Sequence, residues 1–213
     1  MKKVLGICFF ILLSSTKSFG QNDQYLEKGH LTLGVRTTTS LFDHDNIPGL
    51  GSGGQFRLQL FDFLSTEGFA DWITQDLKGA GTRKNAHIGW SVLFYPKKFN
   101  RITPYVSVGH CFDFTQVRPL STPFENRSGE TLQQWSSAAQ IGVGSHFFIS
   151  QRFNLSLSAQ YMLHFGGQLG YELNEVSEGE YFLKVGPQLQ GEKNTEGHLL
   201  LSVSLNYRIG DLW

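Results

Sequence analysis

The sequence lacks three features that would narrow its class quickly: a cysteine pair, a long apolar run and a net charge. Only 2 cysteines occur among 213 residues, and Cys8 lies in a segment that we expect to be removed on export. Cys111 alone would remain, which excludes an intrachain disulfide. No stretch reaches the roughly 18 consecutive apolar residues of a spanning helix. The formal net charge is +0, and without a basic stretch we expect no nucleic-acid partner.

The first twenty residues have the composition of an export signal. Lys2 and Lys3 precede an apolar run over residues 4–13, and small residues flank Phe19 in the tripeptide Ser18-Phe19-Gly20. This order of a basic, an apolar and a small-residue region is typical of a secretory signal peptide. We therefore predict a signal peptide over residues 1–20 and one domain over residues 21–213.

The rest of the chain is rich in apolar and polar residues that alternate with a period of two. Between residues 199 and 209, Leu201 and Val203 share one face, whereas Ser202 and Ser204 share the other. Successive side chains of a strand point to opposite sides, so this pattern predicts a β-strand. Seven other stretches alternate in the same way, and no helical period competes with them. The eight predicted strands cover residues 31–39, 54–63, 67–74, 86–95, 105–114, 136–149, 154–165 and 199–209.

The connections between these strands also alternate, in length. We expect long connections over residues 41–53, 75–85, 115–134 and 166–197, and short turns after the second, fourth and sixth strands. With both termini on one side, all short turns fall on that side. Short periplasmic turns and long external loops are typical of outer-membrane barrels. The pattern predicts an all-β fold, an eight-stranded antiparallel up-and-down transmembrane barrel.

Alternation does not tell which face points inward. A secreted lipocalin-like barrel buries its apolar face around a ligand, whereas a membrane barrel exposes that face to lipid. The apolar faces here are bulky, and the polar faces carry glycines together with charges of both signs. Inside a narrow barrel these charges could pair. The predicted lumen charge network comprises Arg36, Arg57, Glu67, Asp71, Asp113 and Arg208.

Aromatic residues gather near the strand ends, as in the two interfacial belts of a membrane barrel. The predicted girdle comprises Trp72, Phe112 and Tyr161 near the long connections, and Phe94, Phe147 and Tyr207 near the short turns. We assign Tyr95, Tyr105 and Phe148 to the second belt as well. The alternative is an aromatic core of a soluble sandwich.

These features together resemble the small eight-stranded outer-membrane barrels of Gram-negative bacteria, the class of OmpA-like, OmpX-like and OmpW-like proteins. The resemblance rests on the signal Lys2 to Gly20, on segments such as Gly54-Gln55-Phe56-Arg57-Leu58 and His87-Ile88-Gly89-Trp90, and on the last strand. It implies outer-membrane localisation, contact with outer-membrane lipid and a monomer. A terminal aromatic residue, Trp213, implies recognition by the barrel-assembly machinery. Asp211 departs from the pattern, so we expect the strand to end near Ile209.

Few residues suggest chemistry. All seven histidines lie after the signal peptide. His110, His146 and His164 lie on separate predicted strands, and we expect hydrogen-bonded histidines rather than metal ligands. Asp43, His44 and Asp45 have the residue types of a hydrolytic site, as in lipid A-modifying members of the class, although such residues are ordinary in a solvated loop. We expect no catalytic residue, no metal and no cofactor.

We therefore expect any binding function to be carried by the long connections. The last one, residues 166–197, contains an acidic and aromatic set, Tyr171, Glu172, Glu175, Glu178, Glu180, Tyr181 and Phe182, and we expect an added hairpin over residues 181–190. The prediction is a non-enzymatic, structural or surface-binding barrel with an unknown external ligand. The alternatives are a passage for small apolar solutes, a secreted lipocalin-like binding barrel, and a lipid A-modifying enzyme.

Overall fold

The structure is a computed structural model that describes residues 25–42, 47–97, 99, 101–120, 131–165, 169–177, 180–187 and 197–213. The predicted signal peptide lies outside these residues. Within them the chain forms strands, and no helix is long and apolar enough to cross a membrane. The strands are β1 (His30–Phe42), β2 (Pro48–Phe61), β3 (Leu64–Asp76), β4 (Gly81–Phe94), β5 (Ile102–Pro119), β6 (Leu132–Phe148), β7 (Phe153–Phe165), β8 (Leu169–Ser177), β9 (Glu180–Pro187) and β10 (Gly197–Asp211).

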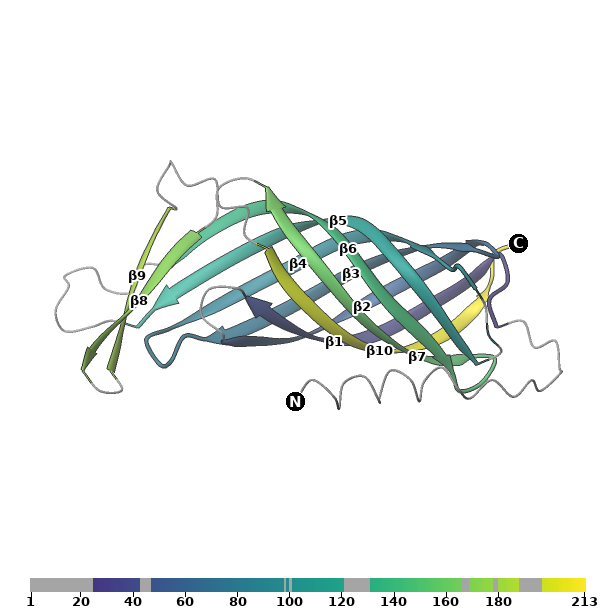
Figure 1. The fold of residues 1–213 in the computed structure, drawn as a ribbon, viewed down its shortest axis with the longest axis horizontal. Helices are drawn as coiled ribbons and strands as arrows, with labels where there is room; N and C mark the ends of the chain where they lie inside the picture. Colours follow the sequence, from purple (N-terminus) through teal and green to yellow (C-terminus); the bar gives the residue numbers. More distant parts are fainter. Residues whose placement is uncertain are drawn as a thin grey trace, which may run out of the picture.

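Eight of these strands close into a barrel, and β8 and β9 form a separate hairpin beyond one end of it (Figure 1). Each barrel strand pairs antiparallel with its neighbours in the order β1-β10-β7-β6-β5-β4-β3-β2. The ring closes where β1 pairs with β10, from His30 opposite Asp211 to Phe42 opposite His198. The predicted eight-stranded antiparallel up-and-down barrel is confirmed.

The apolar face of each strand points outward. On β1, Val35 is 67 % exposed, whereas the adjacent Arg36 is 3 % exposed and lies in the lumen. On the other barrel strands, too, apolar side chains are exposed on the outside. They include Phe56, Trp72, Ile88, Trp90, Val108, Phe112, Ile141, Val143, Tyr161, Val203 and Leu205. A continuous apolar belt of this kind requires a hydrocarbon surround. The alternative of a secreted lipocalin-like barrel is therefore wrong.

The short turns follow the second, fourth and sixth strands as predicted, but two long connections were predicted too long. The loop expected over residues 41–53 is shortened because β1 runs to Phe42 and β2 begins at Pro48. Instead of a loop over residues 75–85, β3 and β4 continue past the expected ends and meet in the four residues 77–80. Lys78 and Gly79 both have positive φ there (52° and 74°), and Leu77 N donates to Gly81 O at 2.9 Å. Two successive positive φ angles are typical of a type I′ hairpin turn.

The last strand also runs further than expected. β10 continues to Asp211, beyond the end near Ile209 that the broken alternation suggested. The register between β1 and β10 shifts between Leu31 and Thr32, which allows Asp211 to pair with His30. Leu212 N then donates to Gly29 O at 2.9 Å. The C-terminal residues are therefore tied to the segment that precedes β1.

An apolar cluster fills the barrel at the end of the short turns. Leu26, which precedes β1, packs there against Leu93, Tyr95, Tyr105 and Phe148. The assignment of these three aromatic residues to the lipid-facing girdle is therefore wrong: all three point inward. Their strand phase contained the signal, because Tyr105 alternates in register with the inward Ser107.

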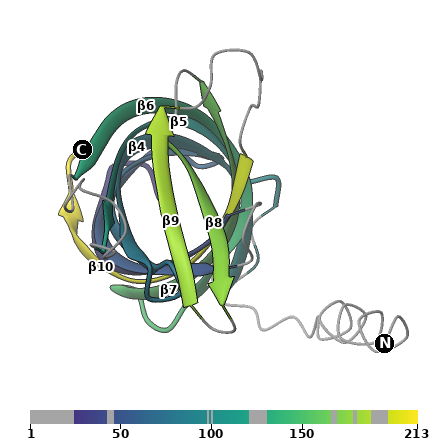
Figure 2. The same cartoon turned by 90° about the vertical axis from the view of Figure 1, so that its left-hand side faces the viewer.

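A second apolar cluster covers the opposite end. Leu169 of β8 and Leu183 of β9 pack against Leu77, Ala80 and Val117 at the tips of the β3–β4 and β5–β6 hairpins. Viewed along the barrel, the β8–β9 hairpin crosses the opening (Figure 2). Both ends of the lumen thus carry an apolar cover.

Candidate functional site

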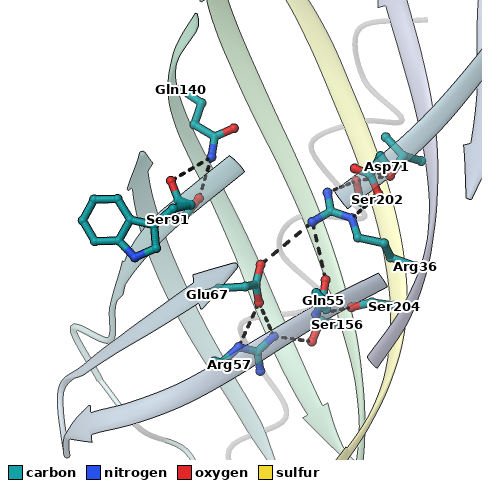
Figure 3. Close-up of polar contacts among 12 residues, drawn as sticks. Arg36, Gln55, Arg57, Glu67, Asp71, Ser91, Gln140, Ser156, Ser202 and Ser204 are labelled. Carbon is teal, nitrogen blue, oxygen red and sulfur yellow. Dashed lines mark hydrogen bonds and ion pairs between the residues drawn. The ribbon is translucent and has the colours of Figure 1, made fainter. Parts of the chain in front are cut away.

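The centre of the lumen holds a network of two cations and two carboxylates. Arg57 on β2 faces Glu67 on β3 directly in the register, and its Nη2 and Nε donate to Glu67 Oε2 at 2.7 and 3.0 Å. Arg36 on β1 lies above them, with Nε 3.0 Å from Asp71 Oδ1 and Nη1 4.0 Å from Glu67 Oε1. Figure 3 shows the four side chains converging from three adjacent strands. The network is buried and its formal charges balance.

Neutral polar side chains from the neighbouring strands β10 and β7 complete this network. Arg36 Nη2 donates to Ser202 Oγ at 2.9 Å, and Arg57 Nη2 to Ser156 Oγ at 3.5 Å. Gln55 Nε2 donates to Ser204 Oγ and Asn206 Oδ1 (Figure 3 shows the serine contact) at 3.1 and 2.7 Å. These bonds cross from β1 and β2 to β7 and β10. Side chains of four consecutive strands in the ring therefore bond to one another inside the lumen.

Asp113 lies in a second cluster rather than with the arginines. Its carboxylate is 3.3 Å from His87 Nε2 and 3.7 Å from His164 Nδ1, and Asn85 Nδ2 donates to both of its oxygens at 3.3 Å. His198 joins through a 3.1 Å contact between its Nδ1 and His164 Nε2. Two histidines, from β4 and β7, thus contact one carboxylate from β5, and a third, from β10, contacts both histidines.

Sequence reasoning missed this histidine cluster. His87, His164 and His198 are far apart in the chain, and only the strand registers bring them to one level of the barrel. Among the described residues no group of three or more ligand-type side chains has the geometry of a metal site. His110 has the outward phase expected of it and packs edge-on to Phe112 with ring centroids 5.0 Å apart.

Arg208 does not join the lumen carboxylates, contrary to expectation. Its guanidinium pairs with Asp211, through Nη2 at 2.7 Å from Oδ2 and Nε at 3.1 Å from Oδ1. Arg208 shares a shallow pocket with Leu26 and Gln59 at the end of the short turns. The three-residue separation from Asp211 places the pair at the rim, where the strand alternation ends.

The predicted girdle residues all lie on outward positions of the barrel. Trp72, Phe112 and Tyr161 are exposed on the side of the hairpin, and Phe94 and Tyr207 on the side of the short turns, whereas Phe147 is half-buried. Two of them pack against other rings. The ring centroid of Tyr207 is 4.9 Å from that of Phe153, and the ring centroid of Phe94 is 6.2 Å from that of Phe63. Their outward direction is compatible with interfacial belts.

The other candidate residues lie partly outside the described chain. Asp43, His44 and Asp45 belong to residues 43–46, which the structure does not describe. Of the acidic and aromatic set, the structure describes the side chains of Glu175 and Tyr181 only. Glu175 is exposed. Lys78 Nζ lies over the ring of Tyr181, 4.4 Å from the ring centroid. A hairpin is present in this connection, but not over the predicted residues 181–190: its strands are β8 and β9, and only β9 overlaps that range.

No family model and no curated protein matches this sequence. Solved structures do. Neisserial surface protein A (NspA) is similar over 84% of this chain and 96% of its own, with a TM-score of 0.56 and 10% identity. A major outer membrane protein from Thermus thermophilus is similar over 84% and 99%, with a TM-score of 0.57 and 12% identity. The chain therefore has the fold of the small eight-stranded outer-membrane β-barrels.

Proposed function

We propose that this outer-membrane barrel is a sealed, non-enzymatic scaffold that presents its external end to a binding partner. The observation that carries the proposal is the filled lumen. Two apolar clusters cover its ends, and between them lie the Arg36–Asp71 and Arg57–Glu67 pairs and the Asp113–His87 pair. An eight-stranded barrel has an interior only about wide enough for side chains.

A third apolar layer supports the sealed state. It is one buried cluster of inward side chains from five strands, Phe69, Ile73, Cys111, Ala138, Met162 and Leu200. Polar groups elsewhere in the lumen bond to one another between strands, as Gln140 Nε2 of β6 does to Ser91 Oγ of β4 at 2.6 Å (Figure 3). A solute would have to displace all of these contacts to pass.

The external end offers the surface for a partner. The β8–β9 hairpin stands outside the barrel ring, and its register runs from Leu169 opposite Pro187 to Ser177 opposite Glu180. Loops and hairpins held by a rigid barrel are common sites of binding because they can change without disturbing the scaffold.

Solute uptake tests the sealed state. Liposomes that contain the folded protein should swell no faster in small sugars or small apolar alcohols than empty liposomes. Swelling that depends on the protein would favour the alternative, a passage for small apolar solutes. The enzyme alternative predicts turnover of purified lipid A by the folded protein, and we expect none.

Deletion of residues 172–192 tests whether the hairpin is separable from the barrel. The variant should still insert into lipid and keep heat-modifiable migration on gels, because all eight barrel strands lie outside the deleted segment. Failure to insert would contradict the division into a scaffold and an external element.

A further inference from the structure

Two cations lie side by side on the outer face of β4 and β5, at the external end. Lys84 is in phase with the outward Ile88 and Trp90, and Arg118 with the outward Phe112. In the register, Lys84 is opposite Gln116 and Thr82 is opposite Arg118, so the two cations are diagonal neighbours. Both are exposed. Like charges at such positions repel unless an anion joins them.

No carboxylate in the described part of the chain pairs with either cation within 4.0 Å. Asp76 is on the same face, opposite Thr82. Its Oδ1 instead accepts a hydrogen bond from Gly79 N at 3.1 Å, within the β3–β4 turn. Within the described residues, the two adjacent positive charges therefore have no carboxylate in direct contact.

Their height relative to the apolar belt fits a lipid headgroup. On β5 and β6, Phe114 and Trp135 are the outward aromatic residues nearest to the two cations on the membrane side, and their ring centroids are 4.9 Å apart. A strand rises about 3.3 Å per residue and tilts about 40° in a membrane barrel. Positions 116 and 118 therefore lie roughly 5 and 10 Å beyond Phe114 along the membrane normal, the depth of the headgroup layer.

The charge is confined to one side of the barrel. At the external ends of β1, β7 and β10, the described outward residues are Leu41, Phe165 and Leu199. Around Lys84 and Arg118, by contrast, the outward neighbours Thr74, Thr82 and Gln116 can donate hydrogen bonds. Asp76, opposite Thr82, is an acidic neighbour on the same face, so the patch carries two cations and one carboxylate. Its net positive charge above aromatic rings suits an anionic group borne on a lipid.

We propose that Lys84 and Arg118 bind the phosphate of a phosphorylated glycolipid of the outer leaflet, of the lipopolysaccharide class. Charge complementarity and height select a lipid phosphate, and the external position selects the outer leaflet. Arg118 supplies a planar pair of donors and Lys84 a mobile point charge, a combination suited to phosphate oxygens. The proposal rests on the membrane location of the barrel and not on the sealed lumen.

The test is a titration of the folded full-length mature protein in detergent with purified lipopolysaccharide. The double variant K84Q/R118Q should bind at least tenfold more weakly than the wild type. The control K97Q/R101Q removes two exposed cations next to the other end of the same two strands and should stay within twofold. Heat-modifiable migration verifies that each variant is folded, and K84R/R118K should retain wild-type binding because it keeps both charges.

Two further arms identify the ligand. Dephosphorylated lipopolysaccharide should bind the wild type as weakly as intact lipopolysaccharide binds K84Q/R118Q. Phosphatidylglycerol vesicles should compete poorly. Unchanged binding by K84Q/R118Q, or equal loss in the control, would overturn the site. Equal competition by phosphatidylglycerol would overturn the assignment to a glycolipid.

Discussion

Arg57 and Glu67 are direct partners across β2 and β3, and their side chains meet in the lumen with Nη2 2.7 Å from Oε2. Glu67 is also the nearest carboxylate to Arg36 after Asp71, at 4.0 Å. One carboxylate therefore serves two buried guanidinium groups. This arrangement makes Glu67 the most sensitive position of the central network.

Replacement of Glu67 with Gln should destabilise the barrel strongly, because it leaves Arg57 buried without its counter-ion. Breaking a buried pair typically costs about 3–5 kcal/mol of unfolding free energy. Urea unfolding in lipid vesicles, followed by tryptophan fluorescence, measures the loss. R57M/E67L, which removes both charges, should recover most of it, and an equally unstable double variant would contradict the pairing.

The rim pair Arg208–Asp211 serves as the matched control. Asp211 is exposed and Arg208 is partly exposed, so water screens the interaction. R208Q should leave the urea midpoint nearly unchanged. A loss as large as that of E67Q would show that Arg208 acts inside the lumen after all.

Asp113 should stabilise the barrel as a hydrogen-bond acceptor. Its oxygens receive Asn85 Nδ2 and Thr115 Oγ1, and His87 approaches at 3.3 Å. D113L leaves these buried donors without a partner, at a cost of about 1–3 kcal/mol for each unsatisfied group. The same urea assay applies, and D113N, which keeps one acceptor oxygen, should lose less than D113L. The reverse order would contradict the hydrogen-bonded role.

Gly144 is required by the ring of Tyr105. A Cβ built at Gly144 would collide with the phenol of Tyr105, the opposite residue in the register. G144V should therefore destabilise the barrel by about 1–3 kcal/mol through overpacking. Combining it with Y105A should relieve the clash with the ring and leave only the close approach to the backbone oxygen of Leu157, so the combined loss should be smaller than the sum of the two. Additive losses would mean that the two residues do not touch.

Leu26 should hold the cover at the end of the short turns. It is 7 % exposed and packs among Leu93, Tyr95 and Phe148. L26A should cost about 2–3 kcal/mol, the lower part of the range for buried leucines, because the site lies at the end of the barrel. Tyr25 stacks on Phe148 at 4.9 Å but is only partly buried, and Y25A should cost less than L26A.

The sequence predicted the strands best where one face meets lipid and the other meets the lumen. Residues such as Val35 and Arg36 then alternate in polarity, and the direction of each follows. Beyond the membrane both faces of a strand can be polar. Residues 75–85 are mostly charged or amide-bearing for this reason, and the hairpin they form had no alternation to reveal it.

Side-chain contacts between strands that are far apart in the sequence could not be predicted from the sequence. The inward direction of Asp113 was predictable, but its partners depend on registers that only the closed barrel defines. The same holds for His198, whose neighbour His164 comes from another strand. Inward aromatic residues such as Tyr105 were missed because position near a strand end was given more weight than strand phase.

The most direct test of the central claim, an apolar face turned to lipid around a polar lumen, uses Trp90. It is 54 % exposed at an outward position of β4, among Ile88 and Val92. In a variant with Trp72, Trp135 and Trp213 replaced by phenylalanine, lipids brominated in the middle of their acyl chains should quench Trp90 fluorescence strongly, and aqueous acrylamide should quench it weakly. Strong quenching by acrylamide with no effect of brominated lipid would contradict the account.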